Sequence, residues 1–178
     1  MELVSLYDDE GHPSGETADR AQVRALNLRH AATAVVVRNH RGDVYVHRRT
    51  DTKDVYPGLY DFAAGGVVQA GEDPAESAVR EVAEELGVTG VALEPIGEAD
   101  YADEHVRYRA FCFTCTWDGP ITWQPEEVAW GEWVSPRRVL AMLDELPFVP
   151  DSPAHLRGWL ESVAGSTPGV QEPTPRPG

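Results

Sequence analysis

Three glutamates stand close together in the segment 80–88, which reads REVAEELGV. If the segment is helical, at about 100° per residue, Glu81, Glu84 and Glu85 fall within an arc of about 100° on one side. Carboxylates this close repel one another unless a cation lies between them, and clustered oxygen ligands suit hard divalent cations such as Mg²⁺. We therefore expect these three residues to form a metal site.

A solvated acidic face is the ordinary alternative for a glutamate-rich helix. Such a face usually carries lysine or arginine four residues from its glutamates, because ion pairs at that spacing stabilise the helix. Glu81 is instead followed at that spacing by Glu85, and no lysine or arginine occurs between Arg80 and Arg107. The pattern favours the metal site.

The sequence also delimits the helix that carries these glutamates. Asp73 suits the N-cap, Pro74 the first helical position, and Gly87 the left-handed residue after the last turn. Arg80 lies outside the arc of glutamates, and we expect it to pair with Glu72 in the preceding loop. The apolar stripe expected to pack against the protein comprises Ala75, Val79, Val82 and Leu86.

The composition indicates one globular domain of 178 residues, of which 42% are hydrophobic. Its net charge of −15 argues against broad binding to nucleic-acid backbones. No apolar run reaches the length of a membrane span, and the first residues lack the features of a secretory signal. The two cysteines, Cys112 and Cys115, are expected to be buried core thiols on opposite faces of a strand. We expect a cytoplasmic protein that does not bind membranes.

Strand and helix patterns alternate along the rest of the chain. Strands are expected over 3–7, 16–18, 31–38, 44–47, 59–68, 91–94, 107–117, 121–123 and 128–134. A short helix is expected over 19–26, and two later helices begin with the N-cap and proline pairs Ser135-Pro136 and Ser152-Pro153. This order predicts an α/β fold in which a mixed sheet carries helices on its faces.

Three regions follow from this pattern. Residues 1–28 are expected to form an N-terminal hairpin and short helix packed on the domain. Residues 29–164 are expected to form the main domain itself. Residues 165–178 lack an apolar period and are rich in proline, so we expect a disordered tail.

Residues 66–88, GVVQAGEDPAESAVREVAEELGV, match the pattern G-x5-E-x7-R-E-U-x-E-E-x-G-U, with U apolar, that marks Nudix hydrolases. The chain resembles this family, which implies an α/β/α sandwich. The resemblance also implies a diphosphohydrolase that uses Mg²⁺ or Mn²⁺ to cleave a nucleoside diphosphate linked to another group, or a related small diphosphate. Structural positions of the motif correspond to Gly66, Glu72, Arg80 and Gly87.

The same resemblance implies a catalytic role for the glutamates of the motif. The expected metal ligands are Glu81, Glu84, Glu85 and the backbone carbonyl of Gly65. One of these glutamates, or one from a loop such as Glu104, would act as general base. The pair Gly65-Gly66 would let the backbone approach metal and phosphate without an intervening Cβ.

Outside the motif, the chain resembles the Nudix branch around type I isopentenyl diphosphate isomerase. The similar segments are LYDDEGHPSG, RHAATAVVVRNHRGDVYVHRRT and TKDVYPGLYD. The isomerases place a cysteine and a histidine where this chain has Gly65 and Val67, and neither replacement can transfer a proton or bind metal through its side chain. A further metal histidine aligns with Val23, although His30 fills another. The isomerase is therefore the second hypothesis, and a non-catalytic Nudix-like binding domain is the third.

Arg49 and Lys53 match cations that hold a diphosphate in that isomerase. A forked guanidinium and a flexible ammonium suit phosphate oxygens, whereas a pair of solvated surface cations is the alternative. His30 is left out of the expected metal ligands, and Asp103-Glu104-His105 is expected to be an exposed turn. The expected partner is a small diphosphate substrate. The sequence leaves the oligomeric state open, with a homodimer as one alternative.

Overall fold

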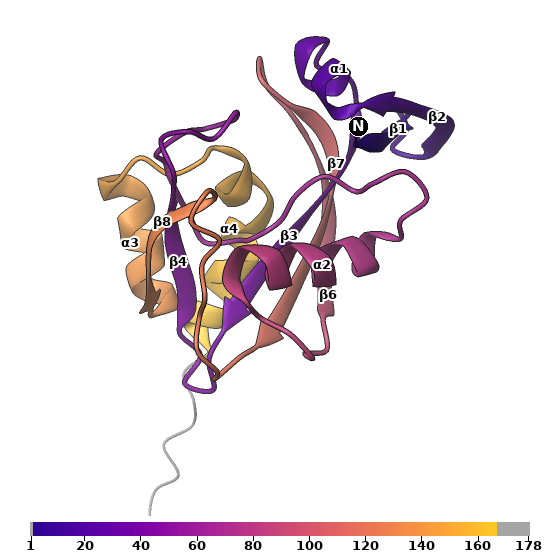
Figure 1. Ribbon diagram of the computed structural model, residues 1–178. Coiled ribbons are helices and arrows are strands. Elements are labelled where there is room, and N and C mark those ends of the chain that lie inside the picture. Colours follow the sequence, from indigo (N-terminus) through magenta and orange to yellow (C-terminus); the bar gives the residue numbers. More distant parts are fainter. Residues whose placement is uncertain (1, 167–178) are drawn as a thin grey trace, which may run out of the picture.

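The computed structural model describes residues 2–166 (Figure 1). The expected tail begins at the last residue of the final helix, and its residues 167–178 lie outside the described part. Within residues 2–166 no helix is long and apolar enough to cross a membrane. In chain order the elements are β1 (Leu3–Tyr7), β2 (Pro13–Asp19), α1 (Arg20–Ala25), β3 (His30–Arg38), β4 (Val44–Arg49), β5 (Tyr60–Asp61), α2 (Pro74–Leu86), β6 (Glu94–Ala102), β7 (Arg107–Thr116), β8 (Val128–Val134), α3 (Pro136–Glu145) and α4 (Asp151–Gly165).

A mixed sheet lies between two helical layers. Strand β3 runs parallel to β7 over nine residue pairs, whereas β6 is antiparallel to β7 and β8 is antiparallel to β4. Figure 1 shows α2 on one side of the sheet and α3 with α4 on the other. Because side chains alternate along a strand, Val35 and Cys115 pack with α2, whereas Val36 and Cys112 pack with α3 and α4. The predicted α/β/α sandwich and the buried thiols are confirmed.

The sheet opens between β3 and β4, and this opening positions the site. Within residues 2–166 these strands pair at Arg38 and Val44 alone. The chain after β5 crosses the opening and makes backbone bridges to β3, from Ala64 to Val35 and from Val67 to Ala32. Residues 62–69 are therefore held in the opening, next to the helix that carries the glutamates.

The predicted strand over 59–68 is wrong beyond Asp61. The carboxylate oxygen Oδ1 of Asp61 accepts hydrogen bonds from the backbone N–H groups of Phe62 (2.7 Å) and Ala63 (3.0 Å). Such local side-chain bonds compete with a strand ladder and bend the backbone. The apolar run of this segment therefore reflects burial in the opening of the sheet and not a regular strand.

Two other strand predictions are also corrected. The strand expected over 91–94 is β6, which begins at Glu94 and continues to Ala102. Its proline, glycine and acidic residues suit the edge of a sheet. The same residues interrupt the apolar alternation by which a strand is predicted from sequence. Residues 121–123 form no strand. Instead, the N–H groups of Thr122 and Gln124 donate to the carbonyl oxygens of Leu86 (3.0 Å) and Glu85 (3.1 Å), so this segment satisfies the last turn of α2.

The expected helix caps are confirmed in two of three cases. Asp73 accepts from Ala75 N–H at the start of α2, and Ser135 accepts from Arg138 N–H at the start of α3. The third is wrong, because α4 begins at Asp151 and Ser152 is buried inside its first turn. The short helix α1 carries a capping box of its own.

Gly87→Ala should destabilise the protein more than Gly90→Ala. Both glycines have φ of +69°, so alanine at either position adopts a left-handed conformation that costs about 1–2 kcal/mol. A Cβ at Gly87 would lie 3.0 Å from Thr122 Cβ, whereas within the described chain none of the surrounding heavy atoms comes within 4 Å of one at Gly90. Denaturant unfolding should show about 1 kcal/mol more loss for Gly87→Ala. Equal losses of stability in the two variants would mean that Thr122 can move away from the added Cβ without destabilising the protein.

Candidate active site

The three motif glutamates of α2 line one cavity together with Gly65 and Gly66. We call it the glutamate cavity; it is also lined by Glu2, Arg20, Lys53, Gln69, Arg80, Gln124 and Glu127. Glu85 is buried, with 6% of its surface exposed, whereas the side chain of Glu84 is 54% exposed. The four residues that the sequence assigns to a metal therefore line one cavity in the structure. Their exposure to solvent differs, from the buried Glu85 to the half-exposed Glu84.

The buried face of α2 differs from the predicted apolar stripe. Ala75 and Val79 are exposed, and the buried residues are Ser77, Ala78, Val82, Glu85 and Leu86. Glu85 thus takes a place on the packed face of the helix, where the N–H of Gly65 donates to its Oε2 (3.3 Å). The stripe prediction failed because it counted apolar residues only, whereas a charged residue here faces the sheet.

A Cβ is excluded by the backbone at Gly65 and would displace the Glu81 carboxylate at Gly66. A Cβ on Gly65 would collide with the carbonyl oxygen of Thr33, and one on Gly66 would lie 2.5 Å from Glu81 Cδ. The carbonyl of Gly66 accepts from Thr33 N–H (2.9 Å). The carbonyl of Gly65 has no hydrogen-bond donor among residues 2–166. It is therefore available as an oxygen ligand beside the glutamates.

Arg80 connects the loop before α2 to the glutamates. It forms the predicted pair with Glu72, through Nε (2.8 Å) and Nη2 (2.9 Å). Although its position on the helix lies outside their arc, its side chain also donates through Nη1 to Glu81 (2.6 Å) and to Glu84 (3.4 Å), contacts that the sequence did not predict. In the described chain no three acidic, histidine or cysteine side chains form a ready-made metal cluster. Arg80 supplies the positive charge that two of the glutamates share.

Burial sets the protonation of these carboxylates. Burial, with help from the repulsion of Glu81 and against the opposing effect of Lys53, raises the pKa of Glu85 to about 7. Burial also raises the pKa of Glu81. A divalent cation in the cavity would favour the ionised forms, because its charge offsets both burial and mutual repulsion. The donor set therefore fits such an ion.

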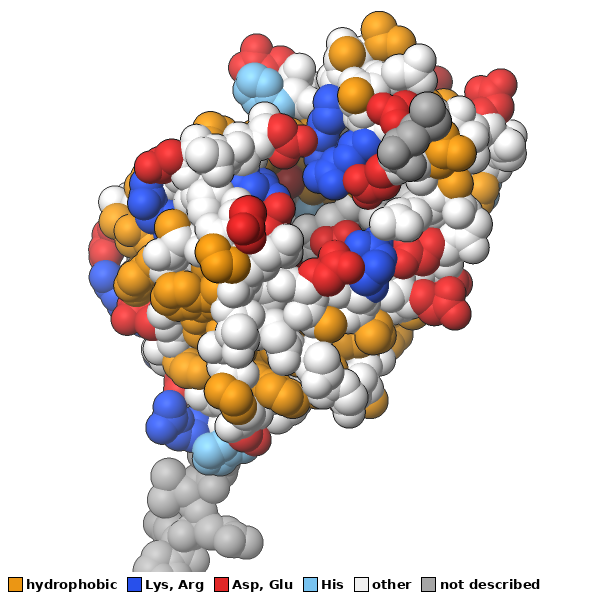
Figure 2. Space-filling view, in the orientation of Figure 1, with side chains coloured by type: hydrophobic (Ala, Val, Ile, Leu, Met, Phe, Trp, Pro, Cys, Tyr) orange, Lys and Arg blue, Asp and Glu red, His pale blue; other side chains and the backbone are white. Residues whose placement is uncertain are grey.

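A second cavity adjoins the first and shares Gly65 and Gly66 with it. Its empty space, counted together with the part open to solvent, is about 660 Å³. Its polar side chains include Arg24, His30, Arg49, Tyr56, Asp61, Tyr108, Asp151, Ser152 and His155. Figure 2 shows acidic and basic side chains gathered around a hollow in this face.

Buried polar groups of the second cavity are held by hydrogen bonds. The ring of His30 bonds through Nδ1 to the carbonyl of Leu28 (2.9 Å), and burial lowers its pKa to about 4, so it is neutral at pH 7. Tyr108 donates to Asp151 (2.7 Å). Burial, with help from Asp151, raises the pKa of Asp61 from 3.8 to about 7. The cavity thus offers hydrogen-bonding groups of fixed orientation.

The two cations predicted to bind phosphate lie in different cavities. Lys53 lines the glutamate cavity and forms an ion pair with Glu127. Arg49 lines the second cavity, where its Nη2 donates to the carbonyl of Val55 (2.9 Å). The neighbouring Arg48 points elsewhere and pairs with Asp51 (2.8 Å). Arg49 and Lys53 therefore flank the junction between the cavities.

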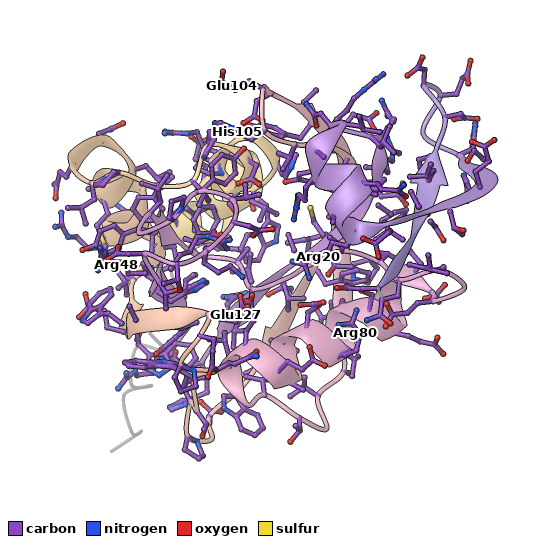
Figure 3. All side chains as sticks on the ribbon, turned by 45° about the horizontal axis from the view of Figure 1, so that its top comes forward. Arg20, Arg48, Arg80, Glu104, His105 and Glu127 are labelled. Atoms are coloured by element: carbon purple, nitrogen blue, oxygen red, sulfur yellow. The ribbon has the colours of Figure 1, made fainter. Side chains whose placement is uncertain are left out.

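Glu104 lies outside both cavities. Its side chain is 86% exposed, and Figure 3 shows it with His105 at an edge of the molecule far from Arg80. Asp103 accepts from the N–H groups of His105 (2.7 Å) and Val106 (2.8 Å), as expected of an exposed turn.

The glutamate cavity and the second cavity together form the cleft of this protein. Several charged residues of the cleft were not predicted from the sequence. Arg20 and Arg24 of α1 each line one of the two cavities. Asp61 and Glu127 come from β5 and from the loop before β8. The spacing of the two arginines, four residues apart on a short helix, was the one available signal, since such a pair lies on the same helix face.

Comparison with known proteins identifies the family. A family model of the NUDIX domain matches residues 28–154. The uncharacterized Nudix hydrolase orf19 of Rhodococcus erythropolis is 43% identical over 167 residues, which cover 87% of this chain and 90% of that protein. The uncharacterized Nudix hydrolase YfcD of Escherichia coli K12 is 41% identical over 163 residues, which cover 92% and 89%.

Solved structures share the fold. The crystal structure of DR0079 from Deinococcus radiodurans has a TM-score of 0.73 at 23% identity and covers 91% of this chain and 99% of its own. The MutT protein from Methanosarcina mazei has a TM-score of 0.64 at 23% identity, covering 76% and 92%. The matched domain, the relatives and the shared sandwich show that this chain belongs to the Nudix hydrolase family.

Proposed function

We propose that this protein is a divalent-metal-dependent hydrolase that cleaves the diphosphate linkage of a nucleoside diphosphate attached to another group, or of a related small diphosphate. The observation that carries the proposal is the glutamate cavity, in which Glu81, Glu84 and Glu85 meet the unpaired carbonyl of Gly65 within the described chain. Nudix hydrolases generally use divalent metals, which agrees with this donor set.

In the proposed mechanism the carboxylates of Glu81, Glu84 and Glu85 and the carbonyl of Gly65 would hold Mg²⁺ or Mn²⁺, which would supply polarisation of the diphosphate and a lowered pKa of a bound water. Arg80 orients Glu81 and Glu84 while Glu72 fixes Arg80 against the loop. Of the residues that the sequence offers as general base, the glutamates of α2 line the glutamate cavity, whereas Glu104 lies outside both cavities.

Cations on either side of the junction hold the substrate. Lys53 in the glutamate cavity and Arg49 in the second cavity would contact phosphate oxygens, and a charged donor bonds an anion more strongly than a neutral one does. The second cavity takes the group attached to the diphosphate. Its walls combine alanine and valine side chains with the carboxylates of Asp61 and Asp151.

The structure favours hydrolysis over isomerisation. At the two positions where the isomerase carries its cysteine and histidine stand Gly65 and Val67. Val67 is buried in a small core with Val4 and Val23. Neither residue offers a side-chain group that transfers a proton.

A magnesium-dependent screen for phosphate-ester products should cover nucleotide sugars, dinucleoside polyphosphates, coenzyme A, dinucleotide cofactors, oxidised triphosphates and prenyl diphosphates. Isomer exchange without hydrolysis would overturn the proposal.

Glu84→Gln and Glu85→Gln should each lower kcat by about 100-fold or more, because amides bind a divalent cation less well than carboxylates and even outer partners of a metal site cost 10–100-fold. The matched control is Glu76→Gln, which changes an exposed glutamate in the first turn of the same helix. Steady-state kinetics measure the loss of kcat, and the thermal shift on adding Mg²⁺ measures the weaker binding of the cation. A variant with normal turnover would remove that glutamate from the mechanism.

Arg49→Ala should raise KM by about 10-fold with a smaller change in kcat, since the lost charge contacts the ground-state phosphate and the transition state alike. Arg48→Ala, on the adjacent residue of the same strand, is the control because Arg48 lines neither cavity. An unchanged KM for Arg49→Ala would refute the assigned role.

Asp61→Asn should change the pH dependence of stability. The folded state raises the pKa of Asp61 from 3.8 to about 7, so the folded protein binds this proton more tightly than the unfolded chain. Its contribution to stability therefore falls as pH rises from about 4 to about 7. Relative to wild type, the asparagine variant should gain on the order of 2 kcal/mol between pH 5 and pH 8. Parallel profiles from urea unfolding would contradict the shifted pKa.

A further inference from the structure

Helix α1 faces the cleft although it precedes the part of the chain that matches the family. The family match begins at residue 28, whereas α1 spans Arg20–Ala25. Arg20 lines the glutamate cavity and Arg24 lines the second cavity. In Figure 3 Arg20 lies between α1 and α2, on the same side as Arg80. The N-terminal segment thus supplies one cation to each half of the cleft.

We propose that Arg20 and Arg24 form an additional anion-binding site, which holds phosphate oxygens of a substrate whose phosphate chain runs from the glutamate cavity into the second cavity. The proposal rests on the proposed hydrolase function and narrows its substrate to a nucleoside diphosphate derivative or longer oligophosphate bound across the junction. Side chains four residues apart on a helix lie about 5–6 Å from one another at their Cβ atoms, so both arginines reach neighbouring phosphates.

Each arginine has a carboxylate beside it and still lines its cavity. Arg20 lies 3.0 Å from Glu2, and its side chain is 38% exposed, so the pair stays open to the cavity. The Nε of Arg24 is buried 3.3 Å from Asp54 but without the geometry of a hydrogen bond. Burial lowers the pKa of Arg24, and repulsion from Arg20 and Arg49 acts in the same direction, against the opposing attraction of Asp54. A phosphate in the cleft would relieve this repulsion.

A purely structural role for the two arginines is the competing explanation. The pair of Arg20 with Glu2 links α1 to the start of β1, and Val23 between the arginines packs in the small core with Val4. Under that explanation, removing either guanidinium would weaken folding and leave ligand affinity unchanged. Two measurements on the same variants therefore separate the explanations.

The test compares Arg20→Gln and Arg24→Gln with Arg138→Gln in the full chain. Arg138 is the matched control because it is a helical arginine paired with a glutamate, Glu145, and lines neither cavity. Calorimetry should measure binding of inorganic pyrophosphate in EDTA, and steady-state assays should measure KM and kcat with Mg²⁺. Thermal unfolding checks that each variant is folded, and Arg20→Lys tests whether charge alone restores binding.

We expect each cleft variant to weaken pyrophosphate binding and raise KM by about 10-fold, with kcat within about twofold and Arg138→Gln unchanged. Unchanged pyrophosphate affinity and KM in folded variants would overturn the proposal and leave the hydrolase function intact. If wild type hydrolyses no substrate but the variants still lose pyrophosphate affinity, the anion site stands and the hydrolase function fails.

Discussion

Repulsion among the carboxylates of α2 is the constraint on which the rest of the site depends. Glu81 and Glu85 are largely buried, and burial raises the pKa of both. A fold gains nothing from charges in such a place unless something compensates them. Arg80 compensates part of this charge by bonding Glu81 and Glu84, and it is itself fixed by Glu72. The remaining charge, next to the carbonyl of Gly65, is what a divalent cation would neutralise.

The opening of the sheet makes that arrangement possible. Because β3 and β4 pair at Arg38 and Val44 and diverge away from this pair, the chain after β5 can cross between them instead of extending the sheet. This crossing brings Gly65 against the backbone of Thr33, where a Cβ would collide, and Gly66 against the carboxylate of Glu81. The same crossing separates the glutamate cavity from the second cavity, so that one pair of glycines borders both.

Local signals in the sequence were enough to predict the helix of the motif, its caps and a mixed sheet with helices on its faces, and the resemblance to the family added the α/β/α sandwich. Asp73 and Gly87 each act within one turn of α2, so their effect needs no distant partner. Features that depend on packing were missed. Residues 62–68 look like a strand because they are mostly buried, but Asp61 bends the chain. Glu85 is buried, whereas Val79 is exposed, because the N–H of Gly65 in the crossing segment donates to the Glu85 carboxylate. Charged residues that enter the cleft from α1 carry no motif, because their role is set by tertiary position.

The cleft therefore combines two kinds of parts. The glutamate cavity is built mainly from one continuous motif, whose spacing is dictated by helix geometry and by the chemistry of a cation. The second cavity is assembled from α1, β5, β7 and α4, and its side chains Arg24, Asp61 and Asp151 are far apart in sequence. Under the proposed function, substitution of these scattered residues would change the selectivity for the group attached to the diphosphate and would leave the glutamates of α2 in place. Selectivity would then be physically separable from bond cleavage, because it would depend on the elements that surround the motif.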